Sequence, residues 1–202
     1  MKREGLILIL SAPSGAGKTS LCRELFKIFP DMKESVSYTT RTPRVGEVEG
    51  EAYHFVSHAE FERMVKEDAF AEWALVHGNM YGTALRTLVE ARKSGIDLVL
   101  DIDCQGALRL KELFDGGVYV FIMPPSMDEL RHRLEHRSTD VQEVIERRIS
   151  RAAEEIKEAR WYDYIIINDD FEVACQELAS IVTAHRRKTF RMMEQVGKLF
   201  DI

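Results

Sequence analysis

The feature that most constrains this chain is a short apolar run that ends in a glycine-rich turn. Leu6–Leu10 is apolar at every position, and the turn Ser11–Lys18 follows it directly. A continuous apolar run of this length predicts a strand that is buried on both faces of a sheet. Apolar residues then recur at helical spacing over Thr19–Phe29, and Pro30 ends the pattern. A strand, a glycine-rich turn and a helix in this order predict the opening of an α/β fold.

The same alternation recurs along the rest of the chain. Further buried strands are predicted at 97–102, 118–123 and 164–167, and helices at 106–114, 127–136 and about 171–199. Strands that alternate with helices indicate a parallel sheet with helices on both faces. The length of 202 residues fits a single domain whose core needs neither disulfides nor metals.

Two segments interrupt the alternation. Residues 33–82 contain short alternating stretches and a helix that Ser57 opens, with Glu60 three positions later as in a capping box. This pattern predicts a small α+β insert. Residues 137–160 are highly charged and predict a polar helix pair with little apolar face, so that a mobile lid is expected over about 131–160. The core of the domain is then expected at about 1–32, 83–130 and 161–202.

Composition excludes several classes of protein. The net charge of −6 argues against non-specific nucleic-acid binding, which depends on excess positive charge. No apolar stretch reaches the roughly 18 to 20 residues that span a bilayer. The three cysteines are far apart and odd in number, so free thiols in a reducing compartment are expected. We therefore expect a cytoplasmic protein with no membrane and no nucleic-acid partner; the sequence does not distinguish a monomer from a homo-oligomer.

The turn after the first strand has the chemistry of a phosphate loop. Residues 12–19 match the pattern GxxxxGK[ST] except that Ala12 replaces the first glycine. Glycines allow successive backbone N–H groups to curl around a phosphate, and the helix N-terminus adds positive charge. Lys18 can reach the β- and γ-phosphates, and the Thr19 hydroxyl can bind Mg²⁺. The loop therefore predicts a phosphate-loop NTPase type of fold that binds a nucleoside triphosphate, without identifying the reaction.

A second anion site is indicated downstream. Arg41 and Arg44 lie three positions apart among hydroxyl side chains, and arginine binds phosphate with two parallel hydrogen bonds. Tyr53 and Tyr81 can add hydroxyl donors. Glu72 lies in an apolar segment, where a carboxylate needs partners. The residues alone leave open whether this segment is a solvated loop, and whether Glu72 pairs with an arginine or accepts two N–H groups of a ligand.

The sequence as a whole resembles the guanylate kinase family. The resemblance is carried, in family order from about residue 6 to 170, by the phosphate loop and by five later motifs: Ser37-x-Thr39-Thr40-Arg41-x-Pro43-Arg44-x-Gly46-Glu47, Phe70-x-Glu72-Trp73, Tyr81-Gly82-Thr83, Asp101-Ile102-Asp103-x-Gln105-Gly106 and Asn168-Asp169-Asp170. Ala12 at the start of the loop is familiar in bacterial members. The resemblance implies Mg²⁺-dependent transfer of a phosphoryl group from ATP to GMP or dGMP.

The resemblance also implies a role for individual residues. It places ATP on the phosphate loop and on one residue near the fourth strand: Ser11, Ala12, Pro13, Ser14, Gly15, Ala16, Gly17, Lys18, Thr19 and Asn168. It places the GMP phosphate on Ser37, Arg41, Arg44, Tyr53 and Tyr81, and guanine on Glu72 and Thr83 with Asp103 nearby. Thr19 and Asp101 are the expected Mg²⁺ residues. The chemistry agrees, because a carboxylate offers two acceptors to the adjacent N1–H and N2–H₂ donors of guanine.

Arginines of the charged segment complete the predicted site. The resemblance indicates Arg137 and Arg148 as lid arginines that act in catalysis together with Lys18. Phosphoryl transfer needs in-line positioning and cations around the transferring group. Arg131 and Arg151 are expected on a solvated helix face, and so are Arg186, Arg187 and Lys188 near the C-terminus.

Two other functions fit the same fold. Guanylate-kinase-like domains also occur as non-catalytic modules that bind phosphopeptides, but Lys18 and Thr19 of the phosphate loop are intact here. A kinase of the same fold that acts on a sugar phosphate would not need the base-reading pair Glu72 and Thr83. The interpretation favoured by the sequence is therefore a guanylate kinase of purine nucleotide metabolism.

Overall fold

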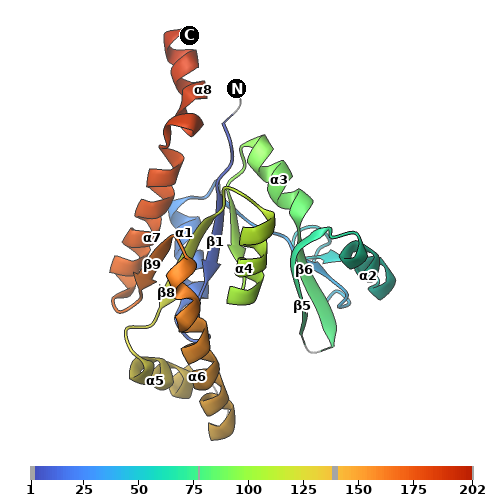
Figure 1. Ribbon diagram of the computed structural model, residues 1–202, viewed down its shortest axis with the longest axis vertical. Coiled ribbons are helices and arrows are strands. Elements are labelled where there is room, and N and C mark those ends of the chain that lie inside the picture. Colours follow the sequence, from blue (N-terminus) through green and yellow to red (C-terminus); the bar gives the residue numbers. More distant parts are fainter. Residues whose placement is uncertain (1–2, 77, 138–140, 202) are drawn as a thin grey trace.

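The computed structural model describes residues 3–76, 78–137 and 141–201. Its centre is a parallel sheet with helices on both faces, and a second, smaller sheet lies to one side of it (Figure 1). A pair of helices, α5 and α6, lies at the end of the molecule opposite the two chain termini (Figure 1). The α/β class predicted from the sequence is confirmed.

The central sheet has five parallel strands in the order β2-β7-β1-β8-β9. Their bounds are β1 Ile7–Ser11, β2 Lys33–Glu34, β7 Leu98–Asp101, β8 Val118–Met123 and β9 Tyr164–Ile167. In register, Leu10 of β1 pairs with Asp101 of β7 and with Val120 of β8. Because parallel strands end at one edge of a sheet, the loop after β1 and the loop after β7 are neighbours.

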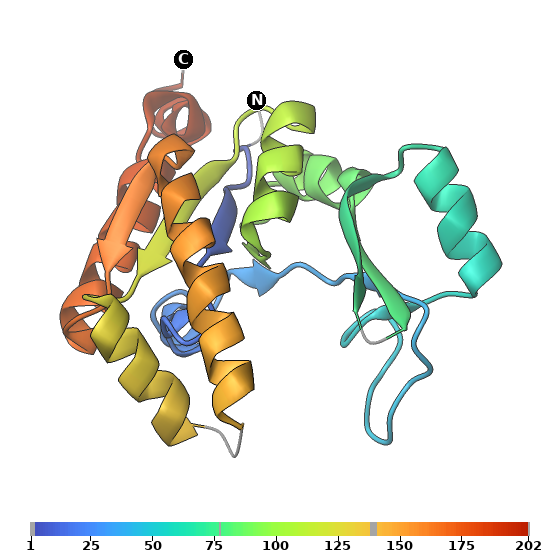
Figure 2. The same ribbon diagram turned by 60° about the horizontal axis from the view of Figure 1, so that its bottom comes forward.

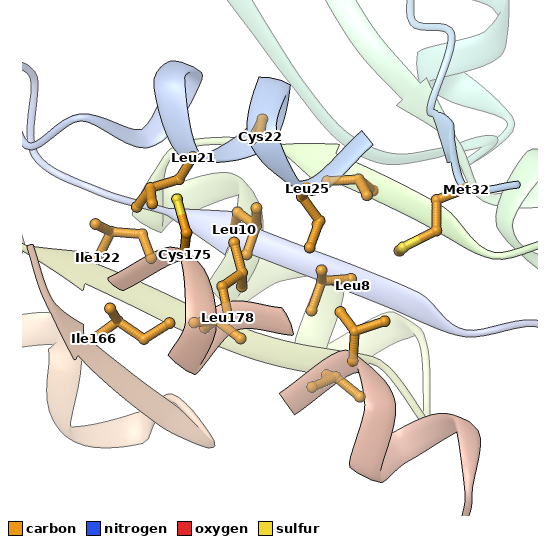
Figure 3. Packing of buried hydrophobic residues seen from close by; sticks show 14 of the residues in the cluster. Leu8, Leu10, Leu21, Cys22, Leu25, Met32, Ile122, Ile166, Cys175 and Leu178 are labelled. Atoms are coloured by element: carbon orange, nitrogen blue, oxygen red, sulfur yellow. The ribbon is translucent and has the colours of Figure 1, made fainter. Parts of the chain in front are cut away.

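Helices cover both faces of this sheet. One face is packed by α1 (Lys18–Ile28) and α7 (Phe171–Arg186), and Figure 3 shows Leu8 and Leu10 of β1 between them. The other face is packed by α3 (Leu85–Ser94) and α4 (Cys104–Leu113). Successive residues of β1 alternate between the two faces, and all five strand residues are buried. This burial explains the continuous apolar run at the start of the chain.

The smaller sheet has four strands in the order β4-β3-β6-β5. Their bounds are β3 Tyr38–Thr39, β4 His54–Phe55, β5 Phe70–Val76 and β6 Asn79–Ala84. Helix α2 (His58–Lys66) packs on it, and the rings of Phe61 and Phe70 stack with centroids 4.4 Å apart. The Ser57 hydroxyl accepts a hydrogen bond from the Glu60 N–H, as the capping-box pattern predicts.

The charged segment forms the pair α5 (Met127–Arg137) and α6 (Gln142–Lys157), followed by the 3₁₀ turn η1 (Glu158–Trp161). The expectation of little apolar face is wrong: Leu130 and Leu134 of α5 are buried against Ile145 and Ala152 of α6. Residues 145, 149 and 152 form a narrow apolar stripe at helical spacing, which the many charges around it conceal. The same leucines also reach the phosphate loop, since a Cβ at Gly15 would lie 3.0 Å from each of them.

The single terminal helix predicted over about 171–199 is also wrong. Helix α7 ends at Arg186, and a separate helix α8 (Thr189–Phe200) begins after Lys188, whose ψ of 138° is not helical. The bend brings Arg191 of α8 against the N-terminal segment, where it donates a hydrogen bond to the Glu4 carbonyl. Such a tertiary contact overrides helix propensity and leaves no signal in the local pattern.

The edge strand β9 offers a matched test of the core. Ile166 is 1% exposed and its neighbour Ile165 is 50% exposed. Deletion of buried isoleucine methyl groups costs about 2–5 kcal/mol. We therefore expect Ile166→Ala to lower the free energy of unfolding by that amount, and Ile165→Ala to lower it by less than about 1 kcal/mol. Chemical denaturation measures both; equal losses would contradict the assignment of the two faces.

Candidate functional site

The turn between β1 and α1 depends on two glycines with left-handed backbone. Gly15 and Gly17 both have φ of 95°, and Gly17 is the N-cap of α1. This region of φ is open to glycine at little cost. The first N–H groups of a helix lack intrahelical acceptors and carry partial positive charge. The turn is therefore shaped to receive an anion.

Asn168 supports this loop from behind. The residue is 4% exposed, and its Nδ2 donates a hydrogen bond of 2.7 Å to the Ala16 carbonyl. A Cβ at Gly17 would lie 2.3 Å from the same nitrogen, so glycine is needed there for space as well as for φ. Arg133 of α5 donates to the Asn168 carbonyl at 3.1 Å. Ser11, the last residue of β1, is also fully buried beneath the loop.

A cavity of about 610 Å³ lies in front of the loop. Nine residues predicted from the sequence line it: Ala12, Pro13, Ser14, Gly15, Gly17, Lys18, Thr19, Asp103 and Arg148. The structure thus brings the phosphate loop, the end of β7 and helix α6 to one site. Arg137 is the last residue of α5, and its side chain lies outside the part of the chain that the structure describes.

Lys18 is held at the carboxyl edge of the sheet. Its Nζ forms an ion pair with Asp101 and donates to the Ile102 carbonyl at 3.3 Å. The Lys18 side chain is only 17% exposed, so its charge is partly desolvated and directed toward the end of β7. The predicted phosphate-binding lysine and the predicted Mg²⁺ carboxylate are therefore direct neighbours.

A second cavity, of about 360 Å³, lies on the other side of the β7 end. Four predicted residues line it: Ser37, Tyr53, Thr83 and Asp101. The first cavity is lined by Asp103 and this one by Asp101 and Ile102, so the two cavities adjoin at the loop between β7 and α4. Figure 2 shows α4, which follows this loop, between α6 on one side and the smaller sheet on the other.

Arg41 is held in place by an acid. Its guanidinium donates to both carboxylate oxygens of Glu47, at 2.7 and 2.9 Å, and the Arg44 N–H donates to the same carboxylate at 2.7 Å. These bonds hold the pKa of Glu47 below its usual range. The guanidinium carbon also lies 5.4 Å from the ring centre of Tyr53, whose ring meets that of Tyr81 at 5.8 Å. Four of the five residues predicted to bind the GMP phosphate thus lie together, namely Arg41, Arg44, Tyr53 and Tyr81.

Glu72 and Thr83 face each other on neighbouring strands. They are paired in the antiparallel ladder of β5 and β6, and Thr83 is buried. Burial raises the pKa of the Glu72 carboxyl, hydrogen bonds from Thr83 oppose that shift, and the nearby charge of Asp103 adds to it. The Glu72 side chain packs on α4, where a Cβ at Gly106 would lie 3.2 Å from its Cγ. Gly106 therefore leaves room for this carboxylate.

Sequence reasoning missed Ser20 of α1 and three side chains of α6 that line the first cavity. Arg147, Arg151 and Glu155 of α6 line it, and Arg151 is not on a purely solvated face: its Nε donates to Glu155 at 3.1 Å, and its Nη2 lies 3.7 Å from Asp103. The i, i+4, i+8 spacing of these residues could have indicated a shared helix face. Asp103 is also the N-cap of α4 and accepts a hydrogen bond from the Gly106 N–H.

The phosphate loop lies at the carboxyl edge of a parallel sheet, and three arginines of α6 line the polar cavity in front of it. These features define a protein of the phosphate-loop α/β class. A family model described as guanylate kinase matches residues 4–185. The chain belongs to the guanylate kinase family.

Individual relatives agree over the full length. A curated guanylate kinase of Geobacter metallireducens is 61% identical and one of Geobacter sulfurreducens is 60% identical, each over 100% of both chains. The crystal structure of guanylate kinase from Anaplasma phagocytophilum superposes with a TM-score of 0.68 at 36% identity, and covers 100% of this chain and 98% of that one. The family resemblance and the fold class predicted from the sequence are thus confirmed.

Gly17 allows a direct test of the loop support. Gly17→Ala adds a methyl group in contact with Asn168, whereas Gly46→Ala adds one where no atom lies within 4 Å, at a similarly positive φ of 88°. Both variants carry backbone strain of about 1–3 kcal/mol, and only the first also breaks the bond between Asn168 and Ala16. We expect Gly17→Ala to lose more stability and to lose ATP binding. Thermal unfolding measures the stability of the two variants, and calorimetric titration measures their affinity for ATP. Equal stability and equal ATP affinity of the two variants would contradict the role of Asn168 in supporting the loop.

Proposed function

We propose that this protein transfers the γ-phosphoryl group of ATP to GMP or dGMP and yields the corresponding diphosphates. The observation that carries the proposal is the meeting of two cavities at the end of β7, one lined by the phosphate loop and the other by Thr83, the strand partner of Glu72. Membership of the guanylate kinase family supports the same reaction. A non-catalytic module or a sugar-phosphate kinase is not favoured by these relatives.

The ATP phosphates would bind in the loop. Backbone N–H groups of the turn and the start of α1 surround the β- and γ-phosphates, and the Lys18 ammonium would exchange Asp101 for phosphate oxygens. Asp101 would then be free of its ion pair. Asn168 takes part indirectly, because it fixes the Ala16 carbonyl and so the shape of the loop.

The side chains at this edge fit a Mg²⁺ ion that arrives with ATP. Mg²⁺ keeps several waters and binds proteins through one or two oxygen side chains together with substrate phosphates. Thr19 and Asp101 are such oxygen donors, and Thr19 is exposed to the cavity. Among the described residues no group of three His, Cys, Asp or Glu side chains is placed to hold a metal ion. When bound, the ion would neutralise charge on the phosphates.

The GMP phosphate would bind on the group around Arg41. In this group the Arg41 guanidinium is already oriented by Glu47 and by the ring of Tyr53. Ser37, Tyr53 and Tyr81 add hydroxyl donors, and Arg44 adds a second cation. Charge-assisted hydrogen bonds to such donors contribute about 1.5–3 kcal/mol each, which is enough to position the acceptor oxygen for in-line attack.

Guanine would be recognised by Glu72 and Thr83. The two carboxylate oxygens match N1–H and N2–H₂ of the base, and the Thr83 hydroxyl can donate to O6, where adenine presents an amino group. Asp103 lies near enough to raise the pKa of Glu72, which supports the proposal that it lies beside the base. Polar matching of this kind discriminates about 10⁴-fold or more, because the wrong base leaves buried groups unpaired.

Arg137 and Arg148 would act on the transferring group when the lid closes. Closure of a lid excludes the water that would otherwise hydrolyse ATP. Three parts of one domain would then act together: the core binds the donor, the region around 33–82 binds the acceptor, and the region around 131–160 is the lid.

We place the reaction in purine nucleotide metabolism in the cytoplasm. The free, buried thiols of Cys22, Cys104 and Cys175 agree with a reducing compartment. No helix in the described residues is long and apolar enough to cross a membrane.

A coupled assay with ATP and a panel of nucleoside monophosphates tests the proposal. We expect turnover with GMP and dGMP, poor use of AMP, CMP and UMP, and loss of activity in Lys18→Ala with an unchanged thermal unfolding midpoint. Turnover near that of wild type in Lys18→Ala would remove the phosphate loop from the reaction. Equal use of all monophosphates would remove guanine recognition.

Base recognition predicts a specific pH dependence. Glu72 must be ionised to accept two N–H groups, and burial raises its pKa above that of an ordinary glutamate. As pH falls, kcat/KM for GMP should therefore decline from a higher pH than an ordinary carboxyl would give. Glu72→Gln should lower kcat/KM for GMP about 10- to 100-fold, since an amide donor then faces a guanine donor, and should remove this acid limb.

The comparison separates base recognition from other effects. The phosphate of GMP titrates equally in wild type and variant, so only the difference between the two pH profiles reports on Glu72. The already poor use of AMP should fall much less than the use of GMP. Equal losses for GMP and AMP would make Glu72 a structural residue.

A further inference from the structure

A cationic cavity lies at the end of the molecule opposite the phosphate loop. It has a volume of about 470 Å³ and lies at the bend between α7 and α8, next to the N-terminal segment. Five cations line it together with one acid: Arg3, Arg186, Arg187, Arg191, Lys198 and Glu194. Figure 1 shows the bend and the N-terminus together, far from α5 and α6.

The expectation of a solvated face at Arg186–Lys188 is wrong for Arg186. Its side chain is 19% exposed, packs over the ring of Phe29 at 4.8 Å and lies 2.8 Å from the carboxylate of Asp97. Asp97 is 2% exposed and also binds Arg3 with two hydrogen bonds, of 2.7 and 2.6 Å. One buried carboxylate is thus shared by two arginines at the base of the cavity, and Arg186 also pairs with Asp31 at 2.9 Å.

The other cations that line the cavity are not all paired with carboxylates. Lys198 pairs with Glu194 at 2.6 Å. Within the described residues, Arg187 and Arg191 have no carboxylate within ion-pair distance, and the contact of Arg187 is with the Met192 sulfur at 3.8 Å. The cavity therefore carries a positive excess in a protein whose net charge is −6.

Arg191 is the most constrained of these cations. It is 4% exposed, it donates one bond of 2.6 Å to the Glu4 carbonyl, and its Nε is buried with no acceptor among the described residues. Burial lowers the pKa of this guanidinium. Asp97 and Glu4 attract this charge from beyond ion-pair distance, whereas Arg3 and Arg92 repel it. Burial of a charge is costly, and an anion in the adjoining cavity would offset part of that cost.

We propose that this cavity is a second anion site, separate from the catalytic one, that binds a multiply charged phosphate such as a di- or triphosphate group. Arginine is suited to phosphate because its planar fork forms two parallel hydrogen bonds. Several cations around one space favour a multiply charged ligand over a monovalent carboxylate. The volume lies within the range of roughly 300–1,000 Å³ of small-ligand sites.

Such a ligand would connect three segments of the chain. Arg3 belongs to the N-terminal segment, Arg187 follows α7, and Arg191 and Lys198 belong to α8. A ligand that binds only the folded arrangement stabilises it in proportion to its occupancy. The anion would therefore stabilise the bend and the docking of α8.

Calorimetric titration with tripolyphosphate in the Lys18→Ala background tests the site, because that background lacks the lysine of the phosphate loop. Three proteins are compared at one ionic strength. They are the single variant Lys18→Ala, the double variant Lys18→Ala with Arg187→Glu, and the double variant Lys18→Ala with Arg160→Glu. Arg187 and Arg160 are both exposed arginines, and only the first lines the cavity. We expect saturable binding of tripolyphosphate to Lys18→Ala. The added Arg187→Glu should weaken this binding at least about 10-fold, because one charge-assisted contact is lost, and the added Arg160→Glu should weaken it less than about 3-fold.

Further readouts distinguish the source of the phosphate. Tripolyphosphate should raise the thermal unfolding midpoint of Lys18→Ala and raise it less with Arg187→Glu. A parallel titration with uridine triphosphate shows whether a nucleoside is tolerated on the phosphate chain; equal or tighter binding assigns the site to nucleotides, and weaker binding to free polyphosphates. Absence of saturable tripolyphosphate binding in Lys18→Ala, or equal losses in the two charge-reversed variants, would overturn the proposal.

Discussion

The hydrogen bond between Asn168 and the Ala16 carbonyl is the contact on which the phosphate loop depends. It exists only because Gly17 has no Cβ, and it joins the loop after β1 to the residue after β9, across the sheet. The Asn168 N–H donates to Met123 at the end of β8, and its carbonyl accepts from Arg133 of α5. One residue thus connects the phosphate loop through its side chain with β8 and α5 through its backbone, so that the loop is anchored to the rigid core.

A second theme is the pairing of phosphate-binding cations with carboxylates. Lys18 is paired with Asp101 and Arg41 with Glu47, both at positions where a phosphate is expected. Each acid orients its cation and compensates its charge. In the proposed binding mode, exchange of carboxylate for phosphate would cost little reorganisation, because the donors are already oriented. The acidic net charge of the chain and its cationic sites are therefore compatible.

The sequence predicted what depends on local pattern. The strands β8 and β9 begin and end at the predicted residues, and α1, α4 and α5 lie within two residues of theirs, because buried strands and amphipathic helices repeat with fixed periods. The bend at Lys188 and the apolar stripe of α6 were missed, since the first depends on a distant carbonyl at Glu4 and the second is outnumbered by charges. The roles of Arg151 and Glu155 were missed for a similar reason: only the packing of α6 over the loop shows which of many charges faces inward.

The contact of Leu130 and Leu134 with the region of Gly15 has a mechanical consequence. Helix α5 therefore rests on the phosphate loop, and α5 in turn packs on α6, whose arginines line the cavity in front of that loop. If this helix pair moves as the proposed lid, the leucine contact couples the position of the arginines to the shape of the loop backbone.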